Sequence, residues 1–248
     1  MGRLDLSLSS HYSTGDYGPD QDTDIFYAPF VARAELGPWM LKLVLPYIIV
    51  SGGGVEGPAG PVAGSGGTHD GLGDIVAEVS YTFWFAQRWA PILEIGSRVK
   101  FPTADEDEGL GTGEFDVTPE IELAGILGRW TPFASAGYRV LGDSQDSTYY
   151  DGFVVTAGTT VRVTERLEAG GFLYWRQASS EVTLPRDGPP PERPRTGRAD
   201  DPFEIIPYLR WTLSSSWLVD FYVSAGLSDG SPDVGTGLTL RYRISLDD

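Results

Sequence analysis

Apolar and polar residues alternate along almost the whole chain, and this period of two constrains the fold more than any other feature. In residues 74–85, DIVAEVSYTFWF, apolar side chains occupy every second position, with Glu78, Ser80 and Thr82 between them. Successive side chains of a strand point to opposite faces, so this segment is predicted to be a strand with one apolar and one polar face. The pattern alone leaves open whether the apolar face points to a core or to lipid.

The same alternation recurs about twelve times, in segments of roughly 10 residues, the length that a tilted strand needs to cross a bilayer. The segments are 3–8, 26–35, 39–47, 74–85, 93–101, 115–123, 134–140, 153–162, 168–176, 203–211, 219–225 and 238–244. Tight links near 37–38, 86–88, 128–129, 164–166 and 214–216 take turns with longer connectors at 13–23, 51–73, 102–113, 142–152, 178–201 and 228–233. This order is typical of an up-and-down barrel with short turns at one end and long loops at the other.

The number of strands indicates which way the apolar face points. A barrel of about eight strands can fill its interior with side chains, whereas one of about twelve is too wide for a layer of Ala, Val and Leu. We therefore expect the apolar residues to face lipid and the charged residues to face the interior. Aromatic residues near strand ends fit girdles at two membrane interfaces: Trp39, Tyr47, Trp89, Phe101, Trp130, Trp175, Trp211 and Trp217. The alternative is a soluble β protein of sandwich or lipocalin type.

Composition excludes several classes of protein. The chain has 248 residues, and no run approaches the roughly 20 apolar residues that a membrane helix needs. It has no cysteine and two histidines, which leaves no thiolate metal site, no disulfide framework and no His-rich metal site. The net charge of −17 argues against nucleic acid as a partner. We expect one domain over residues 1–248, without cofactor or metal.

Three motifs follow one another in the first half of the chain: GLGD at 71–74, KFPTAD at 100–105 and GLGTGEFD at 109–116. With them the chain resembles the outer-membrane "transporter" family named for the meta pathway of phenol degradation. The resemblance is firmest over about residues 71–125 and rests beyond that on the strand rhythm. It implies an all-β fold: an antiparallel up-and-down transmembrane β-barrel of about twelve strands, with short periplasmic turns and long extracellular loops. A channel or uptake role is what the resemblance implies for function.

Basic and acidic residues are nearly balanced on the predicted inner face, and we expect them to line a pore. The predicted lining residues are Arg33, Lys42, Glu78, Glu94, Arg98, Lys100, Asp116, Glu120, Glu122, Arg139, Arg162, Glu168, Arg176, Glu204, Arg210, Asp220, Arg241 and Arg243. Residues at equal distances from a hairpin turn face each other across the two strands. Four pairs meet this condition or nearly meet it: Arg162–Glu168, Arg210–Asp220, Glu120–Arg139 and Glu78–Arg98. We expect cross-strand ion pairs there; the alternative is separately hydrated charges.

The long connectors carry most of the excess negative charge, at Asp16, Asp20, Asp22, Asp24, 105–108, Asp143, Asp146, Asp151, Asp229 and Asp233. The run DEDE lacks the spacing and the glycine of a calcium loop, so we expect solvated charges, with divalent-ion bridges to lipopolysaccharide as the alternative. Connector 178–201 is instead Pro-rich and basic, with Arg186, Arg193, Arg195 and Arg198. We expect it to be mobile or to point outward; the alternative is an inward constriction.

These features favour a porin-like channel in the outer membrane of a Gram-negative bacterium, its signal peptide already removed, for passive passage of small solutes. The expected partners are the lipid bilayer, lipopolysaccharide and an unidentified small solute. The alternative is a closed-lumen barrel that anchors or supports a larger envelope complex, with protein partners there. A further alternative is a hydrolase at the barrel rim, built from Ser9, His11 and Asp70. We do not expect an enzyme, because nothing in the spacing brings those three residues together.

Overall fold

The computed structural model describes residues 2–15, 22–57, 60–86, 91–142, 149–179, 181–184, 195–198 and 200–246. These residues form β1 (Gly2–Gly15), β2 (Thr23–Leu36), β3 (Trp39–Gly57), β4 (Gly60–Leu72), β5 (Ile75–Trp84), β6 (Ile92–Phe101), β7 (Asp116–Ala124), β8 (Trp130–Arg139), β9 (Gly152–Arg162), β10 (Leu167–Arg176), β11 (Glu181–Leu184), β12 (Arg195–Arg198), β13 (Phe203–Thr212), β14 (Trp217–Gly226) and β15 (Val234–Ser245). None of them lies in a helix long and apolar enough to cross a membrane.

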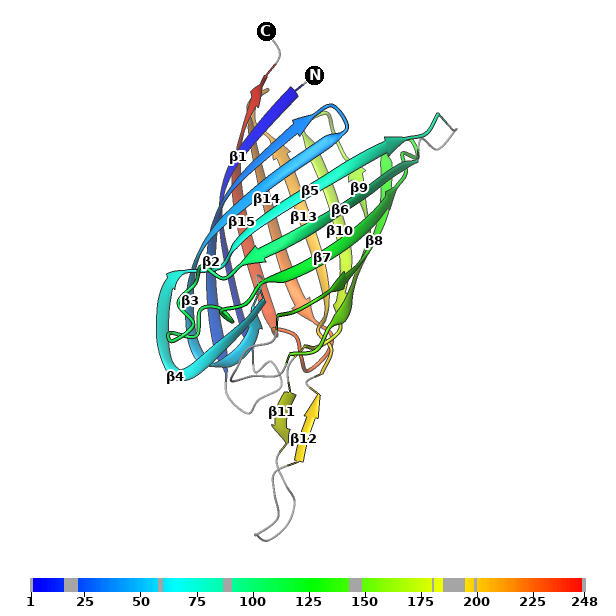
Figure 1. The fold of residues 1–248 in the computed structure, drawn as a ribbon. Coiled ribbons are helices and arrows are strands. Elements are labelled where there is room, and N and C mark those ends of the chain that lie inside the picture. Colours follow the sequence, from blue (N-terminus) through cyan, green and yellow to red (C-terminus); the bar gives the residue numbers. More distant parts are fainter. Residues whose placement is uncertain are drawn as a thin grey trace.

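The strands close into a barrel (Figure 1). Neighbours are antiparallel in the order β2-β1-β15-β14-β13-β10-β9-β8-β7-β6-β5-β3, and the pairing of β2 with β3 completes the circle. These twelve strands correspond to the twelve segments predicted from the alternation, which confirms the predicted fold class. Closure leaves no open sheet edge in the bilayer, where an unpaired backbone N–H or C=O group would be costly.

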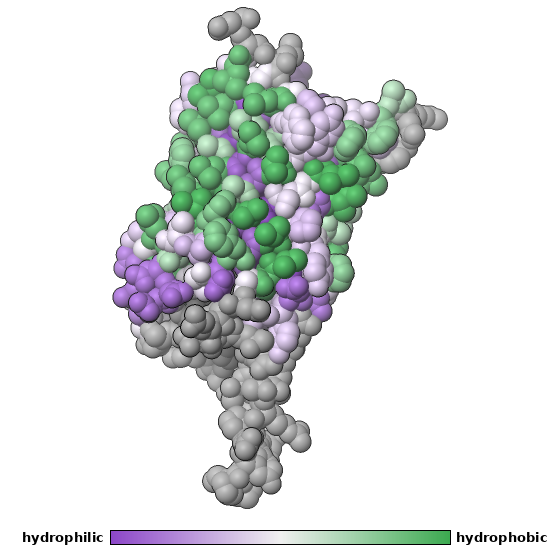
Figure 2. Space-filling view, in the orientation of Figure 1, coloured by the Kyte–Doolittle hydropathy of each residue, from purple (hydrophilic) through white to green (hydrophobic). Residues whose placement is uncertain are grey.

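The apolar faces of the strands point outward, as predicted. In β3, Leu41 and Leu43 are 48% and 41% exposed, whereas Met40 and Val44 on the opposite face are 5% and 9% exposed. Figure 2 shows apolar side chains covering much of the visible wall. Large apolar side chains exposed over so wide a surface mark a contact with another apolar phase, and on a transmembrane barrel that phase is lipid.

Aromatic side chains lie near both ends of this apolar surface. Trp39 and Trp211 are 52% and 57% exposed at strand ends beside the short turns, and Phe115 and Phe153 are 55% and 53% exposed beside the long connectors. Aromatic rings with one apolar and one wet side suit the two membrane interfaces. Trp39 and Trp211 belong to the predicted girdles, whereas Phe115 and Phe153 were not among the predicted girdle residues. Trp89 lies outside the described residues.

Short turns join the strands at the end of the barrel where both termini lie, and longer connectors join them at the other end (Figure 1). We name these the turn end and the loop end. Gly37 and Gly128 adopt φ of 63° and 67° in two of the short turns, in the left-handed region that favours glycine. In another, the Ser214 hydroxyl accepts a hydrogen bond from the backbone N–H of Trp217 at 3.1 Å. The predicted alternation of short and long connectors is thereby confirmed.

One predicted connector is wrong. Residues 51–73, expected to be a loop, instead extend β3 to Gly57 and form β4. β3 therefore has two partners on one side: β5 over Trp39–Val44, and β4 over Tyr47–Gly57. Glycine and proline hide these strands in the sequence, because an alternation needs side chains whereas the backbone hydrogen bonds of a strand pair do not.

Part of the basic connector forms a second hairpin. β11 and β12 pair from Glu181↔Arg198 to Leu184↔Arg195 and project beyond the loop end, away from the barrel interior (Figure 1). This placement agrees with the outward expectation and not with an inward constriction. The remainder of the connector, with Arg186 and Arg193, lies outside the described residues, as do the acidic residues Asp16, Asp20, Asp143 and Asp146.

The band of apolar residues predicts a depth-dependent cost for charge on the outer wall. Leu43 lies midway between Trp39 and Tyr47 in β3, so Leu43→Arg should lower the free energy of unfolding by about 2–4 kcal/mol, the cost of a basic residue near the bilayer midplane. The measurement is a urea titration of the protein refolded into vesicles. Leu227→Arg is the matched control, because Leu227 is 53% exposed but lies past the end of β14. Equal effects at the two positions would contradict the proposed membrane band.

Candidate functional site

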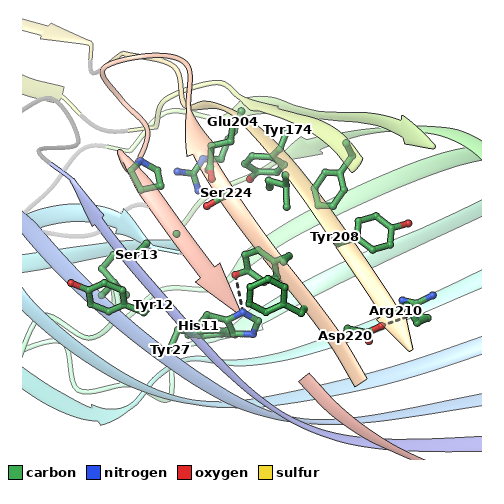
Figure 3. A pocket seen from close by; sticks show the side chains of 18 of the residues that line it. His11, Tyr12, Ser13, Tyr27, Tyr174, Glu204, Tyr208, Arg210, Asp220 and Ser224 are labelled. Carbon is green, nitrogen blue, oxygen red and sulfur yellow. Dashed lines mark hydrogen bonds and ion pairs between the residues drawn. The ribbon is translucent and has the colours of Figure 1, made fainter. Parts of the chain in front are cut away.

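The barrel interior holds a cavity of about 620 Å³ whose walls are largely aromatic. The rings come from β2, β8, β10, β13 and β14: Tyr27, Phe133, Phe172, Tyr174, Tyr208 and Tyr222. Figure 3 shows Glu204 and Ser224 near one end of this cavity and the pair Arg210–Asp220 near the other. We name it the aromatic chamber. Aromatic faces between polar ends suit small molecules with an apolar body and polar groups.

Glycines on neighbouring strands lie directly against three of these aromatic residues. The pairs are Gly158 with Phe172, Gly170 with Tyr208 and Gly237 with Tyr222. A Cβ at Gly158 would lie 2.5 Å from Cβ of Phe172, and one at Gly170 would lie 2.5 Å from Cζ of Tyr208. Both distances are too short for a real contact. Gly170 and Gly237 therefore let the rings of Tyr208 and Tyr222 lie against the wall of the barrel.

His11 faces the aromatic chamber, but the three residues considered for a hydrolase do not come together. Its Nδ1 atom lies 2.8 Å from the Tyr222 hydroxyl. The Ser9 hydroxyl lies 2.8 Å from that of Thr239. Asp70 accepts a hydrogen bond from Tyr47, which is 39% exposed on the outer wall. Because Asp70 is thus on the opposite side of the wall from His11, this geometry gives no support to a catalytic triad.

A second cavity, of about 230 Å³, adjoins the aromatic chamber and shares Tyr27, Arg98, Tyr174 and Arg176 with it. Three buried cationic side chains contribute to its wall: Lys100, Arg139 and Arg176, which are 4%, 9% and 7% exposed. We name it the basic chamber. Its polar lining contrasts with the rings of the first chamber.

A third and smaller pocket, of about 80 Å³, lies in the turn-end half of β5–β7. Four carboxylates line it, from Glu78, Glu94, Glu120 and Glu122. We name it the acidic pocket. Arg98 lines all three compartments. The three compartments therefore adjoin one another at one arginine.

Two of the four predicted cross-strand pairs are confirmed. Arg210 faces Asp220 in the register of β13 and β14, and its Nε donates to Asp220 Oδ1 at 2.6 Å. Arg98 faces Glu78 in the register of β6 and β5, with Nε of the arginine 4.0 Å from Oε2 of the glutamate. Equal distance from a turn was thus a sufficient guide at these hairpins.

The other two predicted pairs differ in detail. Arg162 does face Glu168 in the register, but the Glu168 carboxylate lies 3.8 Å from Nη1 of Arg210 on the next strand. Glu120 faces Gly137 and not Arg139, so that predicted register is wrong by two residues. The Glu120 carboxylate instead accepts a hydrogen bond from Nη2 of Arg98 at 3.0 Å. Long side chains reach across a strand, which hairpin symmetry ignores.

Shared carboxylates link the inner faces of β13, β14, β15, β1 and β2. Asp220 lies 2.6 Å from Arg210 and 2.9 Å from Arg241. Asp5 lies 3.2 Å from Arg243 and 3.4 Å from Arg3, and Glu35 lies 2.6 Å from Arg3 and 3.0 Å from Arg33. Each of these acids serves two arginines, so we name the set the arginine network.

The three sequence motifs meet at Lys100. Its ammonium lies 2.7 Å from Asp116, 3.3 Å from Asp74 and 2.8 Å from the Thr112 hydroxyl. Asp74 Oδ1 also accepts the backbone N–H groups of Thr103 and Ala104 at 3.0 and 2.9 Å. Asp74 ends the first motif, Lys100 begins the second, and Thr112 and Asp116 belong to the third. The motifs therefore fix the connector between β6 and β7 at the loop end.

Most of the predicted lining residues border one of the three compartments. They are Lys42, Glu78, Glu94, Arg98, Lys100, Asp116, Glu120, Glu122, Arg139, Arg176, Glu204, Arg210 and Asp220. Arg33, Arg241 and Arg243 belong to the arginine network, and Arg162 and Glu168 face each other next to the turn between β9 and β10. Whether these side chains act on a passing solute stays a prediction.

Sequence reasoning left the inner aromatic residues out of the site. Phe172 and Tyr174 alternate with the outward Leu173, and Tyr208 with the outward Leu209, so their parity matched the polar face. The second signal was the glycine opposite or diagonal to each ring in the neighbouring strand. Aromatic residues at the inner parity, next to such glycines, could have indicated the chamber.

A family model agrees with the motifs. The model described as "Putative MetA-pathway of phenol degradation" matches residues 10–244. The chain belongs to this family. The match extends the resemblance from the three motifs to nearly the whole barrel. No curated protein matches the chain in sequence.

Solved structures with the same architecture include the translocator domain of the autotransporter NalP from Neisseria meningitidis. Its TM-score is 0.50, with 8% identity over 98% of this chain and 88% of that domain. The KdgM porin gives a TM-score of 0.45 with 10% identity over 99% of both chains. The outer membrane protein opdK from Pseudomonas aeruginosa gives 0.46 with 10% identity over 98% of both. The likeness to the NalP domain supports the fold, an outer-membrane β-barrel.

Removing the Lys100 ammonium should destabilise the loop end. Lys100→Met leaves Asp74 and Asp116, both less than 10% exposed, without their shared cation, at a cost of about 3–5 kcal/mol in unfolding free energy. Lys42→Met is the control, because Lys42 and its partner Glu78 are 34% and 21% exposed and such a pair contributes about 0–1 kcal/mol. Urea titration in vesicles measures both. Similar small losses would show that the Lys100 cluster does not hold the loop end.

Two adjacent glycines test the packing of the aromatic chamber. Gly170→Ala should cost about 1–3 kcal/mol and displace Tyr208, because the new methyl group overlaps its ring. Gly171→Ala should be nearly neutral, because the nearest atom to its Cβ is 3.5 Å away. Urea titration compares the two variants. A neutral Gly170→Ala variant would mean that Tyr208 is not held against the wall.

Proposed function

We propose that the chain is an outer-membrane channel for the passive passage of small solutes. The observation that carries this proposal is the series of compartments inside the barrel, of about 620, 230 and 80 Å³, which share Arg98. A barrel that served only as an anchor would have no need of adjoining internal cavities lined by charged and aromatic side chains. The family description and the barrel fold support a transport role.

The proposed setting is the outer membrane of a Gram-negative bacterium, with the signal peptide removed. The lipid bilayer contacts the apolar outer wall, and lipopolysaccharide surrounds the acidic loop end. A solute would enter at the loop end, pass the aromatic and basic chambers, and meet Arg98 before the acidic pocket. Selectivity would come from the charges of the wall and the width of the lumen, without a conformational cycle or a cofactor.

One observation favours a second function. The acidic pocket in the turn-end half measures only about 80 Å³, and the ion pairs of the arginine network occupy the inner faces of β13–β15, β1 and β2 in the same half. A barrel closed at this level would serve as a structural or anchoring subunit of a larger envelope complex. Conductance separates the two functions, because only an open lumen carries ions across the bilayer.

Single-channel recording of the refolded protein in a planar bilayer tests the channel. The wild-type protein should give steady ohmic steps. Arg98→Ala should increase the step size, because it removes a side chain that lines all three compartments. Arg129→Ala, in the exposed turn after β7, is the control and should leave the step unchanged. Silence from protein shown to be inserted and folded would favour the closed, structural barrel.

A further inference from the structure

Two carboxylates on one side of the turn-end lumen, those of Glu94 and Glu122, form no direct ion pair within the part of the chain that the structure describes. Glu94 and Glu122 face each other across β6 and β7. Among the described residues neither forms an ion pair within 4.0 Å, although the Ser80 hydroxyl donates to Glu94 at 2.6 Å. Like charges directly opposite each other on a sheet are unfavourable. With Glu78 and Glu120 in the same pocket, this wall carries an excess of negative charge that Arg98 and Lys42 only partly balance.

The arginine network carries an excess of positive charge. Its five arginines share three carboxylates, those of Asp5, Glu35 and Asp220. Glu168, 3.8 Å from Arg210, adds a fourth carboxylate, which still leaves one positive charge over. A chain of ion pairs links β15 to β2, and it begins with an arginine, Arg243, and ends with another, Arg33.

The strand order places these two walls on opposite sides of the lumen. In a closed barrel of twelve strands, each strand is diametrically opposite the strand six places along, which pairs β6 with β14 and β7 with β15. The acidic wall on β5–β7 therefore faces the basic wall on β13–β15. The pocket beside the acidic wall has a volume of only about 80 Å³, so a solute at this level lies close to the wall.

We infer that this opposition makes the turn-end lumen selective for small zwitterions, solutes that carry one ammonium and one carboxylate group. The inference rests on the proposed channel function and names its solute class. A simple cation is attracted by the Glu94–Glu122 wall and repelled by the Arg241 wall, and an anion meets the reverse. A zwitterion oriented across the lumen is attracted by both walls. In a narrow space with little water these interactions are screened less than in bulk solution.

Glycine and glycolamide provide a matched pair of probes, because they are isomers and only glycine is a zwitterion. Their permeation into liposomes that contain the refolded protein is measured by swelling. In the wild-type protein glycine should enter faster than glycolamide. Glu94→Gln with Glu122→Gln should lower the glycine-to-glycolamide ratio about fivefold, the effect of about one unit charge at 4 Å in water. Asp229→Asn, at the exposed loop end, is the control and should keep the wild-type ratio.

Arg241→Gln tests the opposite wall. It should also lower the glycine-to-glycolamide ratio, while the two kinds of variant shift the K⁺-to-Cl⁻ permeability ratio in opposite directions: down for the double glutamine variant and up for Arg241→Gln. Heat-dependent migration on gels confirms folding of each protein. Because the double glutamine variant keeps side-chain shape and removes repulsion, it decides the question even if Arg241→Gln does not fold.

The outcomes separate the two proposals. Conductance with an unchanged glycine-to-glycolamide ratio in the double variant would overturn the inference and leave the channel standing. A ratio lowered only together with a general loss of both solutes would point to a narrowed lumen and also overturn it. No conductance and no swelling from inserted, folded protein would overturn the channel and the zwitterion selectivity together.

Discussion

Every other feature of this protein depends on the satisfaction of backbone hydrogen bonds in lipid. A sheet in a bilayer must close, because its edges find no water to bind. The pairing of β2 with both β1 and β3, and of β15 with both β1 and β14, meets that demand. Closure with twelve strands then creates an interior that apolar side chains alone do not fill. The ion pairs, the aromatic rings and the cavities all lie in this interior.

Different kinds of side chain line the interior at different levels of the barrel. Around the middle of the barrel, aromatic rings lie against glycines and line an open chamber. Nearer the loop end, Ile25 of β2 and Ile48 and Val50 of β3 form a buried apolar cluster. Towards the turn end, arginines share carboxylates across neighbouring strands. A carboxylate that pairs with two arginines offsets charge on both of them where hydration is limited. The lining of the interior therefore changes along the barrel axis in both side-chain shape and charge.

The sequence predicted the barrel well and its interior only in part. The twelve strands, their outward apolar faces and the order of short and long connectors all followed from a period of two, which is a local property. β4 was not predicted, because its many glycines and its proline give no alternation of apolar and polar side chains. The Arg210–Asp220 ion pair was predicted from hairpin symmetry. Glu120 instead pairs with Arg98 on a different strand, and this pairing depends on the length of the side chains. The aromatic chamber was not predicted, because its rings occupy the same alternate positions as the charged residues. In addition, only closure of the barrel brings β2, β8 and β13 around one cavity.

The pairing of β1 with β15 also has a consequence for how the barrel assembles. Most neighbouring strands are close to one another in the chain, whereas Ser9 and Thr239, which face each other in this pair, are 230 residues apart. Contacts over such a separation carry the largest loop-closure entropy and form slowly. The hairpins can therefore form from local contacts first, with the β1–β15 seam joining later. The bond between Arg243 and Asp5 crosses that seam, so this part of the arginine network is complete only when the cylinder has closed.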